Sequence, residues 1–289
     1  MSRSSRSLIL PLVAAAAVLL AACGAGTDTG TAGGDGGSVA SGALPGEHVH
    51  GVARNPGDGK VYLATHQGLF RYDKTGPVRV GPVVDFMGFA VAGPGRFYAS
   101  GHPGDGVDLP APVGLMETRD AGKTWSVKSL GGQSDFHALT SSSKGVLAFD
   151  GALQSSADGK TWSQLAIGVE PATLTSAPDG SRILAMTTSG VMFSGDQGAT
   201  WAPLPGAPQL LLATWADNAT AMGVTNTGAL AVSTDAGATW TTAAGKVDSV
   251  QAMCATRAKD GTVEVLVVTD SAIQRTVDSG ATFSPLGAS

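Results

Sequence analysis

The sequence is poor in charged residues, in cysteine and in long apolar runs, and each shortage excludes a class of protein. Charged residues make up 14% of the 289 positions, with 18 basic against 23 acidic side chains. Such a chain lacks the excess of positive charge that nucleic-acid binding requires, so no nucleic-acid partner is expected. The apolar run over residues 8–22 has 15 positions, too few for a helix that spans a bilayer.

Cysteine occurs only twice, and Cys23 lies at a position that indicates export. It ends the string LAAC directly after the apolar run, and this string resembles the bacterial lipobox, in which the cysteine is acylated and becomes the new N-terminus. With Arg3 and Arg6 ahead of the run, the resemblance predicts a lipoprotein signal peptide over residues 1–22 and a chain anchored through Cys23 to the outside of the bacterial cell membrane. The alternative is an ordinary secretory signal peptide whose cleavage site lies beside a cysteine.

The mature chain is then predicted to consist of a lipidated cysteine, a tether and one folded domain. Loss of residues 1–22 removes two arginines and no acids, which leaves 16 basic against 23 acidic residues, a net charge of −7. Residues 23–45 hold almost no side chain that could pack, so they are predicted to form a flexible tether ahead of a domain over residues 46–289. Cys254 is left as the single free thiol, so no intrachain disulfide can form, and it is predicted to be a buried small hydrophobic residue.

Glycine, by contrast, is abundant, and part of it belongs to a repeated motif. Five copies of the pattern S/T-x-D-x-G-x-T-W/F cross the second half of the chain, the second copy being one residue short, and they end at Trp125, Trp162, Trp201, Trp240 and Phe283. These aromatic residues are 37, 39, 39 and 43 positions apart. Self-similarity at such a period is typical of a repeat architecture.

Each repeat shows the same order of apolar segments. Three strand-like segments precede the motif and a fourth follows it, with Gly, Asp, Asn and Pro between them, which predicts an all-β chain. The alignment gives six units of about 40 residues. Four-stranded units repeated four to eight times build a β-propeller, so the sequence predicts an all-β, six-bladed β-propeller.

The motif has a mechanical explanation in the turn between the third and fourth strands of a blade. Its Asp can accept hydrogen bonds from N–H groups of the turn, and its Gly can take a positive φ at little steric cost. The pattern resembles the Asp-box, or BNR repeat, of sialidase-type propellers, and residues 70–73 carry a degenerate copy. We therefore predict that the motif aspartates are structural and are not metal or acid sites. They are Asp120, Asp158, Asp196, Asp235 and Asp278.

Candidate chemistry lies on the opposite face of the predicted propeller. Loops that enter first strands and loops that leave second strands open on one face, and all five histidines fall in these segments. His48 and His50 begin the first strand of the first unit, where alternation places both side chains on the same side. His66 and His102 end second strands, and His137 begins the third unit in register with His50.

Four carboxylates continue this ring, and the cluster has three interpretations. The carboxylates are Asp85, Asp135 and Glu170 at the starts of first strands and Asp150 at the end of a second strand. Imidazole and carboxylate ligands suit a transition metal such as Zn or Cu, with His48 and His50 as a chelating pair and Met87 as a soft ligand for copper. Two of the carboxylates could instead act as acid and as nucleophile or base in a glycoside hydrolase. Polar residues that merely line a wet channel are the third interpretation.

Five further strings resemble a group of bacterial exported proteins usually labelled glycosylhydrolase-like or sialidase-like BNR-repeat proteins. They are HVHGVA, ATHQGLF, DFMGFAV, ASGHPG and DFHAL, which begin at residues 48, 64, 85, 99 and 135. The resemblance covers nearly all of residues 46–289, and the label implies cleavage of a sugar.

The chain departs from a true sialidase at the residues that bind and cleave the sugar. A sialidase holds its acidic sugar with an arginine triad and uses a tyrosine nucleophile assisted by a glutamate. The tyrosines here are only Tyr62, Tyr72 and Tyr98, all poorly placed for the functional face, and no arginine stands in a recognisable triad context. Sialidase activity is therefore not expected. The sequence predicts binding of a ligand or metal ion through the His/acid cluster, with glycoside hydrolysis of a glycan and an envelope protein-interaction scaffold as the alternatives.

Overall fold

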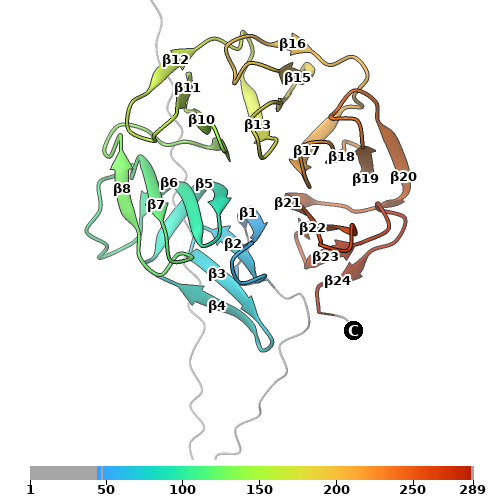
Figure 1. The fold of residues 1–289 in the computed structure, drawn as a ribbon. Helices are drawn as coiled ribbons and strands as arrows, with labels where there is room; N and C mark the ends of the chain where they lie inside the picture. The colour runs from blue at the N-terminus through green and yellow to red at the C-terminus, as the bar shows by residue number, and fades with distance from the viewer. Residues whose placement is uncertain (1–43, 47, 288–289) are drawn as a thin grey trace, which may run out of the picture. The chain divides into compact units, whose positions relative to one another are not determined.

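The computed structural model describes residues 44–46 and 48–287, which form six four-stranded antiparallel sheets. The sheets are arranged as blades around a central axis (Figure 1), so the predicted six-bladed β-propeller is confirmed. None of the described residues belongs to a helix long and apolar enough to cross a membrane. The predicted signal peptide over residues 1–22, Cys23 and nearly all of the tether lie outside the described residues, so these boundaries stay predictions.

Each sheet is built from four strands that follow one another in the chain and pair in that order. The first three sheets contain β1 (Val49–Arg54), β2 (Val61–Thr65), β3 (Gly68–Asp73), β4 (Gly76–Val80), β5 (Val84–Gly93), β6 (Arg96–Pro103), β7 (Leu115–Thr118), β8 (Ser126–Ser129), β9 (Ala138–Ser142), β10 (Gly145–Phe149), β11 (Leu153–Ser156) and β12 (Ser163–Leu165). The last three contain β13 (Pro171–Ser176), β14 (Ile183–Thr187), β15 (Gly190–Ser194), β16 (Ala202–Pro203), β17 (Leu210–Trp215), β18 (Ala221–Thr225), β19 (Ala229–Ser233), β20 (Thr241–Lys246), β21 (Val250–Arg257), β22 (Val263–Thr269), β23 (Ile273–Thr276) and β24 (Ser284–Pro285).

Burial changes from the axis to the rim of each blade. The first strands lie nearest the axis and the fourth strands at the rim, as Figure 1 shows for β1 and β4. The second strands β2, β14 and β18 are buried along their whole length, whereas the fourth strands β16 and β24 are exposed. A strand buried on both faces reads as a continuous apolar run, so the second strands carry most of the packing between blades.

The hydrophobic core is divided among the interfaces between neighbouring sheets. Phe86 and Met116 pack with Leu69 between the first and second sheets, and Leu63 packs with Leu266 between the first and last. The inner strands also contact their neighbours around the ring, including β1 with β21. Side-chain packing between the first and last sheets therefore closes the ring, and radial closure leaves few exposed sheet edges.

The five motif aspartates lie between the third and fourth strands of the second to sixth sheets. In four of them Oδ1 accepts the N–H of the motif threonine and Oδ2 accepts its hydroxyl, at 2.9 and 2.6 Å for Asp235 and Thr239. In the shorter copy, Asp158 accepts the N–H groups of Lys160 and Thr161 at 2.7 and 2.8 Å. Each carboxylate thus accepts hydrogen bonds from residues of its own turn.

The motif glycines have the positive φ that their role predicts, for example 87° at Gly237. The preceding residue also has a positive φ in the four full-length copies, such as 61° at Ala236, which the sequence did not indicate. Consecutive positive φ values are typical of the turns that join tightly twisted antiparallel strands.

The degenerate copy predicted at residues 70–73 does not form such a turn. β3 continues through Asp73, and a two-residue turn leads directly to β4. The Asp73 carboxylate forms ion pairs with Arg71, at 2.6 Å, and with Lys60. Charged neighbours therefore take the place of turn N–H groups in the first sheet.

Candidate metal centre

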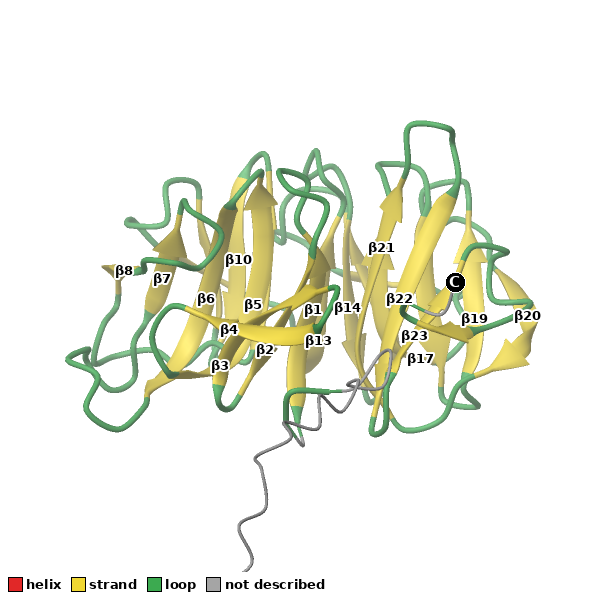
Figure 2. Cartoon of the chain, turned by 90° about the horizontal axis from the view of Figure 1, so that it is seen from below, coloured by secondary structure: helices red, strands yellow, loops and turns green. Residues whose placement is uncertain are grey.

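The histidines and the Asp-motif turns lie on opposite faces of the propeller. The strands run between two faces that carry loops (Figure 2). On one face the turn residue Ala121 donates its N–H to the carbonyl of Gly95, directly before β6. His102 lies at the other end of β6. His102 therefore lies on the face opposite to the turns, as the alignment of the repeats predicted.

Five of the six inner strands, all except β9, have a β-bulge near their start. In β1, Val49 and Gly51 pair with consecutive residues of β2, so His50 is the extra residue of the bulge. The corresponding extra residues of β5, β13, β17 and β21 are Met87, Ala172, Leu211 and Gln251. A bulge bends the strand and re-aims its extra side chain. A cavity of about 300 Å³ at the axis is accordingly lined by His50, Met87 and Gln251, and by His48 and His137.

His48, His50 and His66 form a compact cluster of metal-binding side chains. One ligand nitrogen of each lies within 4.8 Å of those of the other two. The Nε2 atoms of His50 and His66 are 3.3 Å apart. Two ligands of a tetrahedral zinc ion, each bound at the usual 2.0–2.1 Å, are about 3.3 Å apart. The two nitrogens form a hydrogen bond with each other, and their separation equals that of two ligands of one ion.

The His48 ring completes the cluster from the start of β1. Its centroid lies 4.6 Å from that of His50 and 5.4 Å from that of His66. His48 and His66 are exposed and His50 is half-buried, so the cluster is open to solvent.

The carboxylate of Asp85 forms a hydrogen bond with one histidine of the cluster. Oδ1 of Asp85 lies 2.6 Å from Nδ1 of His66. This hydrogen bond favours the tautomer with the proton on Nδ1, which leaves the lone pair of His66 on the Nε2 atom that faces His50. Metal-binding histidines in proteins commonly have such a carboxylate on the second ring nitrogen.

Burial holds His50 in the form that binds a metal. Loss of solvent around the ring, followed by the positive charge of His48 and His66 when protonated, lowers the pKa of His50 from 6.5 to about 4. The imidazole of His50 is then neutral near pH 7, and only the neutral ring has a nitrogen lone pair for a metal ion.

The other two histidines belong to a second cluster centred on Asp135. Its Oδ2 atom lies 3.0 Å from Nε2 of His102 and 2.9 Å from Nε2 of His137. Its Oδ1 atom is buried and has no hydrogen-bond partner among the described residues. The five histidines therefore share one face but form two groups, joined where His137 also lines the cavity at the axis.

The four candidate carboxylates are also divided between the two histidine groups: three lie near His137 and one lies beside His66. Asp135, Asp150 and Glu170 line one cavity of about 590 Å³ together with His137. Asp85 is instead held by His66 in the first cluster. Neither this cavity nor the one at the axis has a lysine or arginine among its described lining residues.

The remaining candidates take no part in either cluster. The Tyr62 hydroxyl donates to Asp58 in the loop after β1, and Tyr98 is bonded to Arg96, both at the far ends of their strands from the histidines. Cys254 is half-buried rather than fully buried, and it packs against the cluster between the first and last sheets. Burial raises the pKa of its thiol to about 12, so it is an unreactive group.

Sequence reasoning missed Gln251, which links the last sheet to the first cluster. Its Oε1 atom accepts the N–H of Val49 at 2.7 Å, and its Nε2 atom donates to Asp270. Gln251 holds the same bulge position in β21 as His50 in β1, so alignment of the first strands residue by residue could have identified it.

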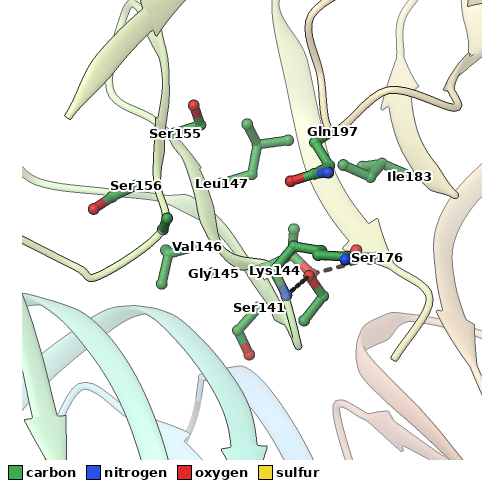
Figure 3. Close-up of a pocket in the computed structure, with 13 residues that line it drawn as sticks. Ser141, Lys144, Gly145, Val146, Leu147, Ser155, Ser156, Ser176, Ile183 and Gln197 are labelled. Atoms are coloured by element: carbon green, nitrogen blue, oxygen red, sulfur yellow. Dashed lines mark hydrogen bonds between the residues drawn. The ribbon is translucent and has the colours of Figure 1, made fainter. Parts of the chain in front are cut away.

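A smaller cavity of about 120 Å³ lies between the third and fourth sheets (Figure 3). Its walls are hydroxyl-bearing and aliphatic side chains together with Lys144 and Gln197, and the Ser176 N–H donates to Thr140 there at 3.0 Å. No histidine or candidate carboxylate lines it among the residues that the structure describes.

Comparison with known proteins identifies the fold and not a family. No protein-family model and no curated protein matches the sequence. Among solved structures, YCF48 from Cyanidioschyzon merolae is similar with a TM-score of 0.52 and 11% identity, over 81% of this chain and 96% of that one. A structure of YCF48 bound to D1 peptide has a TM-score of 0.51 and 15% identity, over 84% of this chain and 83% of that one.

The GH74 enzyme of Niastella koreensis is similar with a TM-score of 0.55 and 17% identity, over 85% of this chain. The present chain spans only 37% of that enzyme. At such identities these likenesses establish the β-propeller fold alone.

Proposed function

We propose that the propeller binds a transition-metal ion, such as Zn²⁺ or Cu²⁺, through His48, His50 and His66. The observation that carries this proposal is the 3.3 Å separation of the His50 and His66 Nε2 atoms inside a cluster of three imidazoles. Three imidazoles are a ligand set that both ions accept. Asp85 supports the set by holding His66 in one tautomer.

Met87 provides a way to distinguish copper, in its reduced form Cu⁺, from zinc. It lines the cavity that His48 and His50 line, and a thioether is a soft ligand that favours copper. Replacement of Met87 by Leu is expected to lower the affinity for Cu⁺ and leave the affinity for Zn²⁺ unchanged if the methionine is a ligand.

Isothermal titration of the purified protein with Zn²⁺ and Cu²⁺ tests the proposal. The wild type is expected to bind one ion, and His50→Ala or His66→Ala to lower the affinity at least 10-fold. His102→Ala is the matched control, since His102 lies in the other cluster and should bind as the wild type does. Circular dichroism establishes that each variant is folded. A folded wild type that takes up neither ion contradicts the proposal.

Glycoside hydrolysis is the second candidate, favoured by the cavity that Asp135, Asp150 and Glu170 line together. Paired carboxylates are the usual machinery of such enzymes, and a structure of similar fold is a GH74 enzyme. Turnover of an aryl glycoside that is lost in Asp150→Asn or Glu170→Gln would support this candidate. Absence of turnover across a broad panel of aryl glycosides would remove it.

Protein binding is a third candidate, because a propeller of similar fold has been solved as YCF48 bound to D1 peptide. A scaffold in the cell envelope would use a face or the rim of the ring and would not need the histidines. Capture of the same membrane protein by the wild type and by the His50→Ala variant would favour this candidate over metal binding.

We further propose that the chain is a lipoprotein held at the outer surface of the cell membrane through Cys23. The proposal rests on the LAAC string after the apolar run. Mass spectrometry of the mature N-terminus is expected to find diacylglycerol on Cys23. An unmodified N-terminus at any other residue would identify an ordinary secretory signal peptide.

A further inference from the structure

The three-imidazole cluster leaves room for a fourth ligand. Among the described residues, the group of metal-binding side chains contains His48, His50 and His66 and no further member. Structural zinc sites use four protein ligands, whereas catalytic sites use three and keep a position for water. Two of the three imidazoles are exposed, so solvent and small molecules reach the cluster.

An Asp–His pair shares a cavity with this cluster. His137 lines the same cavity as His48 and His50. Its Nε2 atom lies 2.9 Å from Oδ2 of Asp135, so this nitrogen carries the proton and Nδ1 carries the lone pair. A carboxylate behind an imidazole orients the ring and stabilises the imidazolium that forms when Nδ1 accepts a proton.

The second cavity provides a place for the substrate, and its charge restricts the substrate class. His137, Ala138 and Ala172 line both cavities, so the two spaces adjoin. The second cavity has a volume of about 590 Å³ and presents the carboxylates of Asp135, Asp150 and Glu170 with no lysine or arginine among its described lining residues. Such a wall attracts a cationic group, hydrogen-bonds a hydroxyl group and repels phosphate or a sugar acid.

We propose that, with Zn²⁺ bound, this site hydrolyses an ester or amide whose alcohol or amine part is neutral or cationic, and that His137 moves the proton. The inference rests on the proposed metal binding. A bound zinc ion supplies polarisation of the carbonyl group and lowers the pKa of a bound water to about 7.

The step balances without a further reactant. The oxygen of water bonds to the carbonyl carbon, and the bond from that carbon to the leaving oxygen or nitrogen breaks. His137 accepts the proton of the attacking water on Nδ1 and gives it to the leaving group. The products are a carboxylic acid and a free alcohol or amine. Asp135 acts as a positioning residue that holds His137.

The experiment compares three probes on the zinc-loaded protein. These are p-nitrophenyl acetate, which is neutral, acetylcholine, which is cationic, and p-nitrophenyl phosphate, which is anionic. Saturable turnover of the two esters and none of the phosphate is expected. His137→Ala should lower kcat for both esters by about 10²- to 10⁴-fold. Its zinc affinity, measured by titration calorimetry, should stay within twofold of the wild type.

Two further variants separate binding from proton transfer. Asp135→Asn is expected to lower kcat with little change in KM, because it acts through His137. Glu170→Gln is expected to raise KM for acetylcholine more than KM for p-nitrophenyl acetate, because it removes negative charge from the wall that attracts the cationic group. If Glu170 had only a structural role, Glu170→Gln would change KM for both substrates by the same factor.

The outcomes keep this inference separate from metal binding. Zinc binding with no turnover beyond that of free Zn²⁺ overturns the hydrolytic inference and leaves the proposed function standing. Turnover that is unchanged in His137→Ala overturns the role of that residue. A protein that binds no zinc overturns both.

Discussion

Asp85 shows how a single hydrogen bond can prepare an imidazole for a metal ion. Its 2.6 Å contact with Nδ1 of His66 holds the ring in place with Nε2 directed toward His50. We predict that Asp85→Asn lowers zinc affinity about 10- to 100-fold, the usual cost of losing such a partner. Calorimetric titration measures the change. Asp150→Asn, a carboxylate of the second cavity, is the matched control, and an equal loss in both variants would contradict the role given to Asp85.

Gly101 is the residue that allows the strand carrying Asp85 to pass close to β6. Its φ is +145°, and a Cβ atom there would lie 1.8 Å from the carbonyl oxygen of Asp85. Gly101→Ala is therefore expected to destabilise the fold by about 1–3 kcal/mol or more and to displace Asp85.

Denaturant unfolding measures the effect of Gly101→Ala against a second glycine variant. Gly93 has a similar φ, +155°, but a Cβ atom there would meet nothing within 4 Å. Gly93→Ala thus isolates the cost of the backbone conformation, and the difference between the variants is the cost of the clash. Equal destabilisation by the two variants would show that the close approach to Asp85 has no energetic weight.

At this scale the sequence placed the candidate histidines on one face but did not predict their grouping. All five histidines and Asp85 were found from their positions at strand ends. Which of them share a site depends on side-chain contacts between blades, such as those of Asp135 with His102 and His137. Repeat spacing carries no information about such contacts.

At the scale of the element, the Asp-motif turns are expected to respond to acid. The hydroxyl and N–H of Thr239 bind the carboxylate of Asp235 and lower its pKa from 3.8 to about 2. A depressed folded-state pKa means that the ionised group adds stability above about pH 4 and that this stability is lost as the pH falls toward 2.

We therefore predict that the difference in Tm between the wild type and Asp235→Asn is constant above about pH 4 and shrinks as the pH approaches 2. An asparagine has one acceptor oxygen and cannot receive both bonds from Thr239. Thermal unfolding across this pH range measures the difference, with the exposed Asp105→Asn variant as control. A difference independent of pH would show that ionisation of Asp235 does not stabilise the turn.

The elements differ in how far the sequence determined them. The five motifs predicted the third and fourth strands of five blades because Asp, Gly and Thr at fixed spacing satisfy one turn geometry. The bulge at His50 was not predicted. A register shift depends on how β1 pairs with β2, and no particular residue type marks its position in the sequence. Residues 70–73 kept part of the motif and still formed a plain hairpin.

At the scale of the whole molecule, the ring closes by packing between the first and last sheets. Leu63 is fully buried there against Leu266. Leu63→Ala is expected to lower the free energy of unfolding by about 2–5 kcal/mol, the usual cost of removing a buried leucine side chain. Val78→Ala is the control, since Val78 is 43% exposed and its loss should cost under about 0.5 kcal/mol.

Denaturant unfolding should show one transition for Leu63→Ala and for the Val78→Ala control, because each blade packs against two neighbours. A separate early transition in Leu63→Ala would show that the first and last blades unfold apart from the rest of the ring.

The two faces of the ring have separate roles in this account. On one face, each motif aspartate accepts hydrogen bonds from its own turn, as Asp235 does from Thr239. The three imidazoles that could bind a metal ion lie on the other face. Anomalous X-ray diffraction from crystals soaked in Zn²⁺, recorded on both sides of the zinc absorption edge, tests the metal centre most directly. We predict one strong peak about 2.0–2.1 Å from a ring nitrogen of each of His48, His50 and His66. A map without a peak between these three rings would contradict the proposed metal centre.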